Sequence, residues 1–488
     1  MSDLAWLVPV ILFVPLLSSI IPMAASLRYR RIGWSVAAVS LSVTFLLTVM
    51  LAIELLSVGS ISYEMGGIAA PYGVELYVDG FSGAVLLLDV LMALGVLAYT
   101  RTAGPRGNAF YNGFLLLAGG MLGIVMAGDV FNLYVFLEVM GLSAYALVAA
   151  ADSRWSTYAA FKYLILGTVG AMVYLLGVGF AFAATGTLNM ADMSVRLAEV
   201  GYTDPIVVTS FALMTIGLAL KIALFPLHTW LADAHAAAPS AISALISGLM
   251  PAVAVYAFVR IIYTVFTVDF LAANPIIAEG LVYGTVLSLL AGNLFALLQR
   301  RIKLMLAYST ISQFGLIVVG LMIANETALF GSILQMFGHG IVKGGLFILA
   351  GMLMLRFDAR RLEDYKGLAT RAPVLAGIFV ALSVTMIGVP PTIGFMGKWY
   401  IAVGAIEEGL WPIAALVVVS TLLTLAYLVP FITRMYFYPF EAGRPDRPDV
   451  TIGMVLAVGL AAAVGIGLGV ATGWIQVVLQ DVIQELVA

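Results

Sequence analysis

Apolar stretches of about 20 residues or more recur along the whole length of this 488-residue sequence. An α-helix needs about that length to cross the roughly 30 Å hydrocarbon core of a bilayer. The composition agrees, because 63% of the residues are hydrophobic and only 10% are charged. The strands of a membrane barrel would instead show shorter segments of alternating polarity. The sequence therefore predicts an all-α integral membrane protein that crosses the lipid bilayer many times.

The apolar pattern predicts about 14 transmembrane segments. The loops between them test this number, because basic residues concentrate in the loops on the inner side of a membrane. If both termini lie outside, most of the 23 Lys and Arg residues fall in inner loops, at 28–31, 101–106, 154, 300–303, 356–371 and 434–447. The predicted segments are 4–26, 33–57, 78–99, 109–128, 129–151, 159–184, 205–231, 239–266, 276–298, 303–323, 328–355, 372–403, 411–433 and 451–475.

Charge and cysteine content exclude several classes of protein. A formal net charge of −3 gives no reason to expect a nucleic-acid partner. The sequence has no cysteine, which rules out disulfides, thiolate zinc sites and cysteine-bound iron–sulfur clusters in this chain. We therefore expect no bound metal or other cofactor here, and any redox chemistry would belong to a partner subunit.

Five ionisable residues fall near the middle of their predicted helices. They are Glu138, Lys221, His339, Lys343 and Lys398. Charges at that depth cost at least ~2.5–3.5 kcal/mol each, so they usually face the interior of the bundle and mark a proton or ion path. The alternative is that they form structural ion pairs that fix helix packing. The recurrence of such residues favours the proton path.

His339 and Lys343 are spaced i, i+4, which places both on one helix face. Two bases so close share protonation, and a histidine that titrates near neutral pH suits proton transfer. A lysine that is desolvated in a bundle loses its proton more easily, so lysines in this setting can load and unload protons. The alternative for His339 is a hydrogen bond to a neighbouring carbonyl.

Helix breakers stand beside two of the lysines. Pro226 follows Lys221, and Pro390, Pro391 and Gly394 precede Lys398. Broken membrane helices are tolerated where they line a cavity or are buried in protein. The breaks fall in segments 7 and 12, five apart, which predicts two five-helix repeats of opposite orientation. The predicted units are 1–103 (segments 1–3), 104–270 (segments 4–8), 271–436 (segments 9–13) and 437–488 (segment 14).

His228, Asp233 and His235 gather near the inner end of segment 7. We interpret them, together with Asp129 and Lys162, as points where protons enter or as supports of the path. A structural hydrogen-bond cluster is the alternative. A metal site is disfavoured, because a third nitrogen ligand is missing and the spacing of the histidines fits one helix face loosely.

Seven motifs carry a resemblance to a known family. In chain order they are "DVFNLYVFLEVMGLSAYALV", "AAFKYLILG", "GTLNMAD", "KIALFPLHTWLADAHAAAPSAISALISGL", "IKLMLAYSTISQFG", "HGIVKGGLFILAG" and "GVPPTIGFMGKW". They resemble the antiporter-like membrane subunits of Mrp-type multisubunit cation/proton antiporters, respiratory complex I and membrane-bound hydrogenases. The resemblance covers residues 80–440, and "DVFNLYVFLEVM" and "GTLNMAD" look most like the D subunit of Mrp antiporters.

The resemblance implies a role for each buried ionisable residue. Glu138 matches the family's segment 5 glutamate and Lys221 the lysine paired with it. His339 and Lys343 match the relay residues of segment 11, and Lys398 matches the segment 12 lysine at the far side of the path. Protons in this family are thought to move along a hydrated row of these residues at mid-membrane.

The implied protein is an ion-transporter subunit and not itself an enzyme. Its expected partners are other membrane subunits, protons and sodium, in the cytoplasmic membrane of a prokaryote. Three alternatives remain open: a proton-pumping subunit of complex I or of a hydrogenase, a largely structural subunit, and a self-contained solute transporter. The last is disfavoured because the helix breaks sit beside lysines and lack groups suited to recognising a solute.

One position departs from the family pattern. Where the family commonly carries a central lysine, in "SGLMPAVAVYAFVR", this sequence has Ala252. Two interpretations remain open. A water chain near Pro251, Ser243 and Ser247 bridges the missing charge, or the subunit conducts poorly and acts mainly as a neighbour of a conducting one.

Overall fold

The computed structural model describes residues 4–26, 28–29, 31–441, 443, 445–447 and 450–487. Arg30 and Arg444, which belong to predicted inner loops, and the extreme termini 1–3 and 488 lie outside these residues. The predicted all-α membrane class is confirmed. In the described ranges, 13 helices are long and apolar enough to cross a membrane. A fourteenth predicted segment, 372–403, is formed by two shorter helices.

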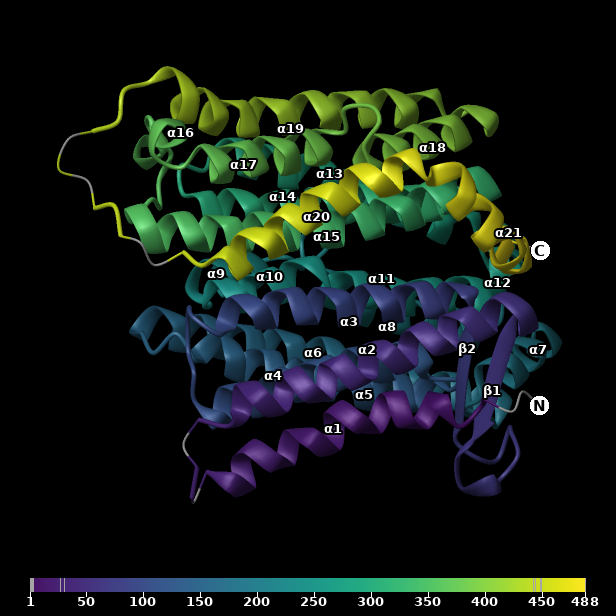
Figure 1. Ribbon diagram of the computed structural model, residues 1–488. Coiled ribbons are helices and arrows are strands. Elements are labelled where there is room, and N and C mark those ends of the chain that lie inside the picture. Colours follow the sequence, from purple (N-terminus) through teal and green to yellow (C-terminus); the bar gives the residue numbers. More distant parts are fainter. Residues whose placement is uncertain are drawn as a thin grey trace.

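The spanning elements run side by side from one end of the molecule to the other (Figure 1). In chain order they are α1 (Leu7–Ala25), α2 (Gly33–Val58), α3 (Gly80–Thr100), α4 (Asn108–Met126), α5 (Val130–Ala149), α6 (Arg154–Thr185), α8 (Pro205–Ile222), the continuous stretch Ser240–Ala273, α13 (Pro275–Leu297), α14 (Ile302–Met322), α15 (Glu326–Phe357), α19 (Trp411–Phe437) and α20 (Ile452–Val470).

The stretch Ser240–Ala273 is divided into α10 (Ser240–Gly248), α11 (Met250–Val259), the π-helix η2 (Arg260–Phe266) and α12 (Thr267–Ala273). Shorter helices join or extend the others. These are α7 (Met190–Val200), α9 (Leu231–Ala237), η3 (Leu362–Tyr365), α16 (Leu368–Arg371), α17 (Pro373–Ile387), α18 (Ile393–Glu407) and α21 (Thr472–Val487). The sequence pattern predicted neither α7 nor α21 as a separate helix.

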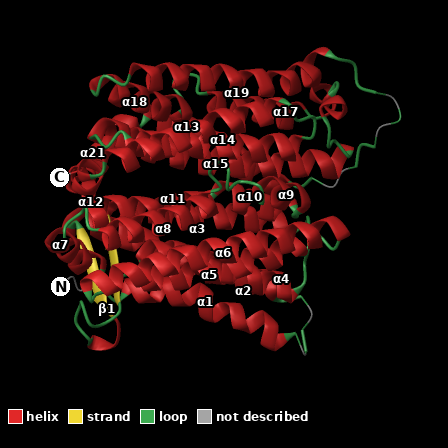
Figure 2. Cartoon of the chain, turned by 180° about the vertical axis from the view of Figure 1, so that it is seen from behind, coloured by secondary structure: helices red, strands yellow, loops and turns green. Residues whose placement is uncertain are grey.

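A small antiparallel sheet departs from the purely helical expectation. Strand β1 (Ser60–Glu64) pairs with β2 (Glu75–Asp79), with Ser60 opposite Asp79, and the short 3₁₀ helix η1 (Met65–Gly67) follows β1. The hairpin lies at the end of the molecule where both ends of the described chain also lie (Figures 1 and 2). It escaped prediction because it is a short connection between α2 and α3.

The first part of the chain forms one set of helices and the segments from α13 to α19 form another (Figure 1). The helices α3, α10 and α15 meet between the two sets. At this meeting place the backbones of α10 and α15 touch, because a Cβ on Gly248 would lie 2.7 Å from the Gly340 carbonyl oxygen. The inversion that would relate residues 104–270 to 271–436 stays a prediction.

Both predicted helix breaks are present. Helix α8 ends at Ile222, and Ala223 adopts the left-handed conformation with φ of 63°. Helix α17 ends at Ile387 before Gly388, whose φ is 88°, and α18 starts at Ile393. The prolines that follow each stop lack the backbone N–H that a continuing helix would need. Each break lies next to a buried lysine, Lys221 or Lys398.

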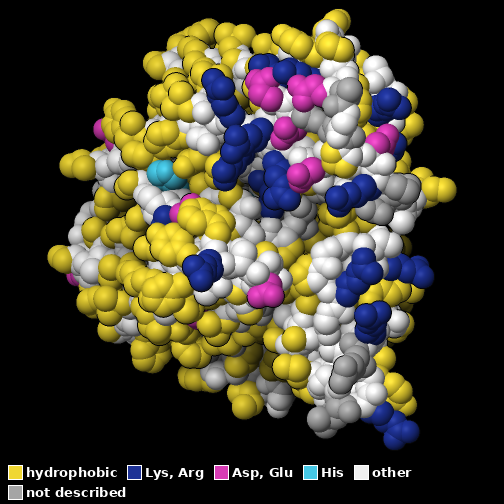
Figure 3. Space-filling view, turned by 90° about the vertical axis from the view of Figure 1, so that its left-hand side faces the viewer, with side chains coloured by type: hydrophobic (Ala, Val, Ile, Leu, Met, Phe, Trp, Pro, Cys, Tyr) yellow, Lys and Arg dark blue, Asp and Glu magenta, His cyan; other side chains and the backbone are white. Residues whose placement is uncertain are grey.

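Basic side chains gather at one end of the molecule (Figure 3). This end carries the α1–α2, α3–α4, α13–α14 and α15–α17 connections, which the sequence predicted as inner loops. Large apolar side chains cover the sides instead, including Leu46, Phe161, Leu422 and Leu456, each more than half exposed. An apolar side surface with charges at the ends is the arrangement that a bilayer requires.

Candidate functional site: charged residues within the helix bundle

Glu138 and Lys221 form a pair between α5 and α8. Lys221 Nζ lies 3.4 Å from Glu138 Oε1 and 3.3 Å from the Tyr145 hydroxyl, which also belongs to α5. The lysine side chain is 3% exposed and that of the glutamate 17%. Lys221 stands in the last turn of α8, where the negative end of the helix dipole favours a cation. The pair thus has a geometry in which the charge on each partner depends on the other.

An aromatic stack fixes the break in segment 7 beside this pair. Tyr145 meets Tyr163 edge-on at 4.5 Å between ring centroids, and Tyr163 stacks on Trp230 at 3.9 Å. The Trp230 indole N–H donates to the Leu220 carbonyl at 3.0 Å, which is one of the last carbonyls of α8. Gly167 makes room for Tyr145, because a Cβ there would overlap the tyrosine hydroxyl. The position of Lys221 is therefore set by packing from α5 and α6.

The three residues predicted to cluster after Lys221 point in different directions. Asp233 pairs with Lys162 of α6 at 2.8 Å. His228 stacks between Phe225 and Phe295, whereas His235 is fully buried and stacks on Phe347 of α15. Two positions apart on a helix differ by about 200°, so Asp233 and His235 of α9 face opposite sides. Within the described part of the chain, no group of three or more His, Cys, Asp or Glu is placed to hold a metal.

Lys343 lies in the centre of α15 and is fully buried. Its ammonium donates to the Leu306 carbonyl at 2.9 Å and to the Ser309 hydroxyl, both on α14. His339, one turn earlier, meets Phe314 edge-on at 4.6 Å between ring centroids. Its Nε2 is buried and has no hydrogen-bond partner among the described residues. The imidazole therefore keeps one nitrogen available for proton exchange.

Lys398 on α18 is bound by the end of the preceding helix. Its ammonium donates to the Ile387 carbonyl at 2.9 Å and to the Met386 carbonyl at 3.5 Å. These are among the last carbonyls of α17, which have no partner inside their own helix. Neither Lys343 nor Lys398 forms an ion pair with a carboxylate of the described residues.

A small cavity lies beside Lys343. It has room for about one water molecule and is lined by residues including Gln313, His339, Lys343 and Met386. Gln335, also in the lining, donates to the Gln313 side chain at 2.7 Å. Because the Met386 carbonyl accepts from Lys398, the cavity joins the surroundings of the two lysines. Polar groups therefore continue from segment 11 to segment 12.

The middle of the row has no charge on α11. Ala252 is fully buried there. The two serines expected to support a water chain are already engaged: Ser243 donates to the His235 carbonyl at 2.8 Å, and Ser247 and Thr310 lie 2.7 Å apart. His235 lies near this uncharged part of the row. Both its ring nitrogens are buried without a partner in the part of the chain that the structure describes.

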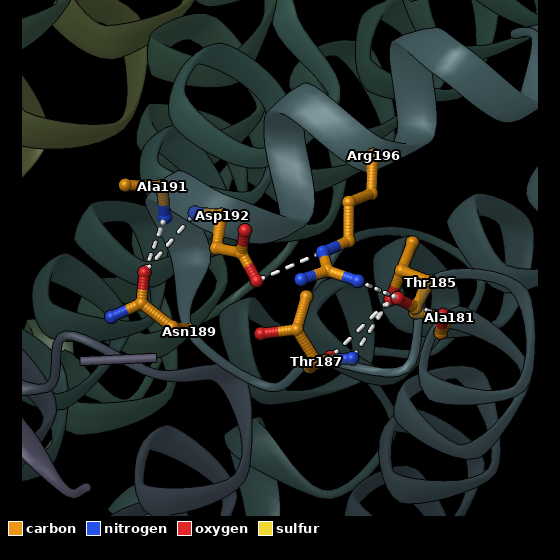
Figure 4. Close-up of polar contacts among 7 residues, drawn as sticks. All are labelled: Ala181, Thr185, Thr187, Asn189, Ala191, Asp192 and Arg196. Atoms are coloured by element: carbon orange, nitrogen blue, oxygen red, sulfur yellow. Dashed lines mark hydrogen bonds and ion pairs between the residues drawn. The ribbon is translucent and has the colours of Figure 1, made fainter. Parts of the chain in front are cut away.

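Two of the motifs serve local structure at the end of the molecule opposite the basic one. Asp129 caps α5 by accepting from the backbone N–H groups of Phe131 and Asn132. In "GTLNMAD", Asn189 caps α7 in the same way, and Arg196 donates to Asp192 at 3.0 Å and to the Thr185 carbonyl at 3.2 Å (Figure 4). Asp129 therefore lies at a helix terminus, away from the buried row.

Sequence reasoning missed three residues near the row. Tyr145 contacts Lys221, Asp89 lies buried within α3, and Lys303 is buried with its ammonium 2.6 Å from the Ala238 carbonyl. The signal that identified Glu138, an acid inside an apolar run, is equally present around Asp89 in "GAVLLLDVLMALG". Lys303 gave no such signal, because it adjoins Arg300 and Arg301 and was assigned to a loop.

The family model and the relatives that match this chain point to the same protein family. The model of the family "NADH:quinone oxidoreductase/Mrp antiporter, TM" matches residues 127–424. The N subunit of the NADH-quinone oxidoreductase of Desulforudis audaxviator is 39% identical over 459 residues, which cover 89% of each chain. The D subunit of the Na(+)/H(+) antiporter of Bacillus subtilis is 31% identical over 471 residues, covering 95% of this chain and 94% of the relative.

Among solved structures, an archaeal respiratory membrane complex, the membrane-bound sulfane sulfur reductase, contains a chain of the same fold. That chain is 27% identical, with a TM-score of 0.91 over 98% of this chain and 97% of its own length. The helices on which the buried row stands fall within the matched family region from α5 through α18. The chain belongs to the NADH:quinone oxidoreductase/Mrp antiporter family of membrane subunits.

Proposed function

We propose that this chain is the proton-translocating subunit of a multisubunit Mrp-type cation/proton antiporter, with sodium as the exchanged cation. The observation that supports this proposal is the pair formed by the partly buried Glu138 and the buried Lys221, followed by Lys343 and Lys398, which have polar partners but no carboxylate among the described residues. A purely structural role would favour complete ion pairs, because an unpaired buried ammonium is costly. A proton path favours lysines that can become neutral.

In the proposed mechanism, the separation of Glu138 and Lys221 controls proton occupancy at one end of the row. The ammonium stabilises the ionised carboxylate at 3.4 Å. When the partners move apart, the carboxylate binds a proton more readily and the lysine releases one more readily. His339, Lys343 and Lys398 then pass protons through the second half, by way of the cavity that His339 and Lys343 line together with Met386, whose carbonyl accepts from Lys398.

The decisive test is Glu138→Gln in membrane vesicles that carry the intact native assembly. The amide keeps the size of the side chain but cannot exchange a proton, so we expect loss of sodium-dependent proton flux with normal assembly. Flux is measured with a pH-sensitive dye and assembly by co-purification. Glu199→Gln, on the exposed face of α7, is the matched control and should retain full flux. Full flux in Glu138→Gln would contradict the proposal.

A second candidate is a proton-pumping subunit of a redox-driven complex. Two observations favour it: the 39% identity with an NADH-quinone oxidoreductase subunit and the similarity to a chain of a respiratory complex. The buried row would serve either assembly. Mass spectrometry of the intact complex separates them, since redox subunits in the particle would identify the second candidate and small membrane subunits alone the first.

A further inference from the structure

Asp89 is a buried acid that the row described above does not use. It lies halfway along α3 and is 2% exposed. Neither of its carboxyl oxygens has a hydrogen-bond partner among the residues that the structure describes. Burial of an ionised carboxylate without a partner is so unfavourable that the group binds a proton instead. Burial therefore favours the protonated form of Asp89, and the surroundings of the group decide what it can do.

The face of α3 that carries Asp89 is turned toward α10 and α11. Ser82, two turns earlier on the same face, has its hydroxyl 2.8 Å from that of Tyr256 in α11. Near the other end of α3, Tyr99 lies close to Ser240, the first residue of α10, because a Cβ on Gly351 would be 2.6 Å from both the Tyr99 hydroxyl and Ser240 Cβ. These contacts show that α10 and α11 run antiparallel to α3.

The same two contacts give the register. Asp89 lies seven residues after Ser82 in α3. Because the helices are antiparallel, it is level with Leu249, which lies seven residues before Tyr256. This residue joins α10 to α11, and its φ and ψ of −110° and −50° depart from regular helix. Pro251 and Ala252 follow after Met250. Asp89 thus stands at the level of the helix junction that precedes Ala252.

Contacts with α15 place Asp89 at the level of the second half of the row. Its neighbour Leu88 lies beside Gly340, because a Cβ on that glycine would be 3.4 Å from a Leu88 methyl group. Met92, one turn later, fills the space beside Gly344. Gly340 and Gly344 directly follow His339 and Lys343 in the chain. The α3 helix runs along the meeting place of the two helix sets (Figure 1).

Few other charged groups surround this position. The helices α4, α10, α11 and α20 carry no Asp, Glu, His, Lys or Arg. The acids of α2 and α21, which are Glu54, Asp481 and Glu485, lie near the end of the molecule that holds the hairpin. The titratable groups at the level of Asp89 on an adjoining helix are therefore His339 and Lys343 of α15.

We propose that Asp89 is a proton-binding residue of the path, carried by α3 at the point where Ala252 leaves the row without a charge. A protonated carboxyl group can donate one proton and accept another at its second oxygen, which is what a relay between two bases requires. The row then includes an acid from outside the predicted five-helix units. This inference rests on the proposed function, because it assigns a further residue to the same proton path.

The test is Asp89→Asn in vesicles that carry the intact assembly. Asparagine keeps the shape and neutrality of the protonated acid but cannot exchange a proton. We expect loss of proton flux with normal co-purification of the partner subunits. Asp89→Glu, which restores an exchangeable carboxyl, should conduct more than Asp89→Asn. Asp481→Asn, an exposed acid on α21 that also packs against α3, is the control and should retain full flux.

An infrared measurement gives a readout that does not depend on flux. The carbonyl stretch of a protonated carboxylic acid should be present in the native assembly and should weaken in Asp89→Asn. Full flux in Asp89→Asn, or Asp89→Glu conducting no better than Asp89→Asn, would overturn the inference. If Glu138→Gln abolishes flux while Asp89→Asn does not, the proposed function stands and only the role of Asp89 fails.

Discussion

At the scale of single residues, the row uses two kinds of partner for its lysines. Lys221 faces a carboxylate, whereas Lys343 and Lys398 donate to carbonyl and hydroxyl oxygens. Carbonyl oxygens at a helix end stabilise an ammonium through partial charges only, so the lysine can lose its proton without leaving an unpaired carboxylate behind. The two halves of the row therefore differ in the chemistry that stabilises their ammonium groups.

Substitution of Lys398 tests whether proton release or positive charge is needed at this position. Lys398→Arg keeps the charge, but a guanidinium does not release its proton in a protein. We expect both Lys398→Arg and Lys398→Met to lose proton flux in vesicles while the assembly still co-purifies. Lys366→Met, in the loop after η3, should conduct normally. Normal flux in Lys398→Arg would mean that a fixed charge is sufficient.

At the scale of the elements, each helix break positions one lysine of the row. In segment 12, Gly388 combines a positive φ of 88° with close contacts, since a Cβ there would lie 3.0 Å from the Gly394 carbonyl oxygen and 3.2 Å from Lys398 Cδ. The break thus needs a residue without a side chain directly beside the lysine. Pro390 and Pro391 then prevent α17 from continuing.

Gly388→Ala should destabilise this break. The left-handed conformation costs a residue with a Cβ about 1–2 kcal/mol, and the contact with Lys398 adds to it. We expect a lower melting temperature of the purified assembly, followed by tryptophan fluorescence, and a reduced proton flux. Gly377→Ala on the same helix is the matched control, because its Cβ would meet nothing within 4 Å. Equal melting of the two variants would contradict the role assigned to Gly388.

At the scale of the whole molecule, the charge distribution defines the two ends. Basic side chains gather at the end opposite the hairpin (Figure 3). In membrane proteins the basic end faces the cytoplasm. We therefore propose that the β1–β2 hairpin, α7 and α21 lie on the outer side of the cytoplasmic membrane.

Single cysteines test this orientation cleanly, because the sequence contains none. Tyr72, in the hairpin, is 91% exposed, and the Arg360 side chain at the opposite end is 65% exposed. We expect a membrane-impermeant maleimide to label Tyr72→Cys in intact cells and Arg360→Cys only after permeabilisation. The reverse pattern would place the hairpin inside.

Most of the fold follows from apolar length and helix breakers, because both act through neighbouring residues in the chain. Each of the fourteen predicted segments coincides with one or more helices, and both predicted breaks lie just before the prolines. The burial of Lys398 was equally readable from the sequence. The partners of a side chain could not be read from the sequence, since they come from helices far away in the chain. Asp233 and His235, close together in sequence, turned to opposite partners for this reason.

The contact of α10 and α15 at Gly248 and Gly340 has a mechanical consequence. Two backbones that touch have no layer of flexible side chains between them, so there is no slack at this point for a displacement to take up. A movement of α15 toward α10 therefore displaces α10 and the adjoining helix junction at Leu249 directly. This contact couples the two sets of helices without an intervening layer of side chains.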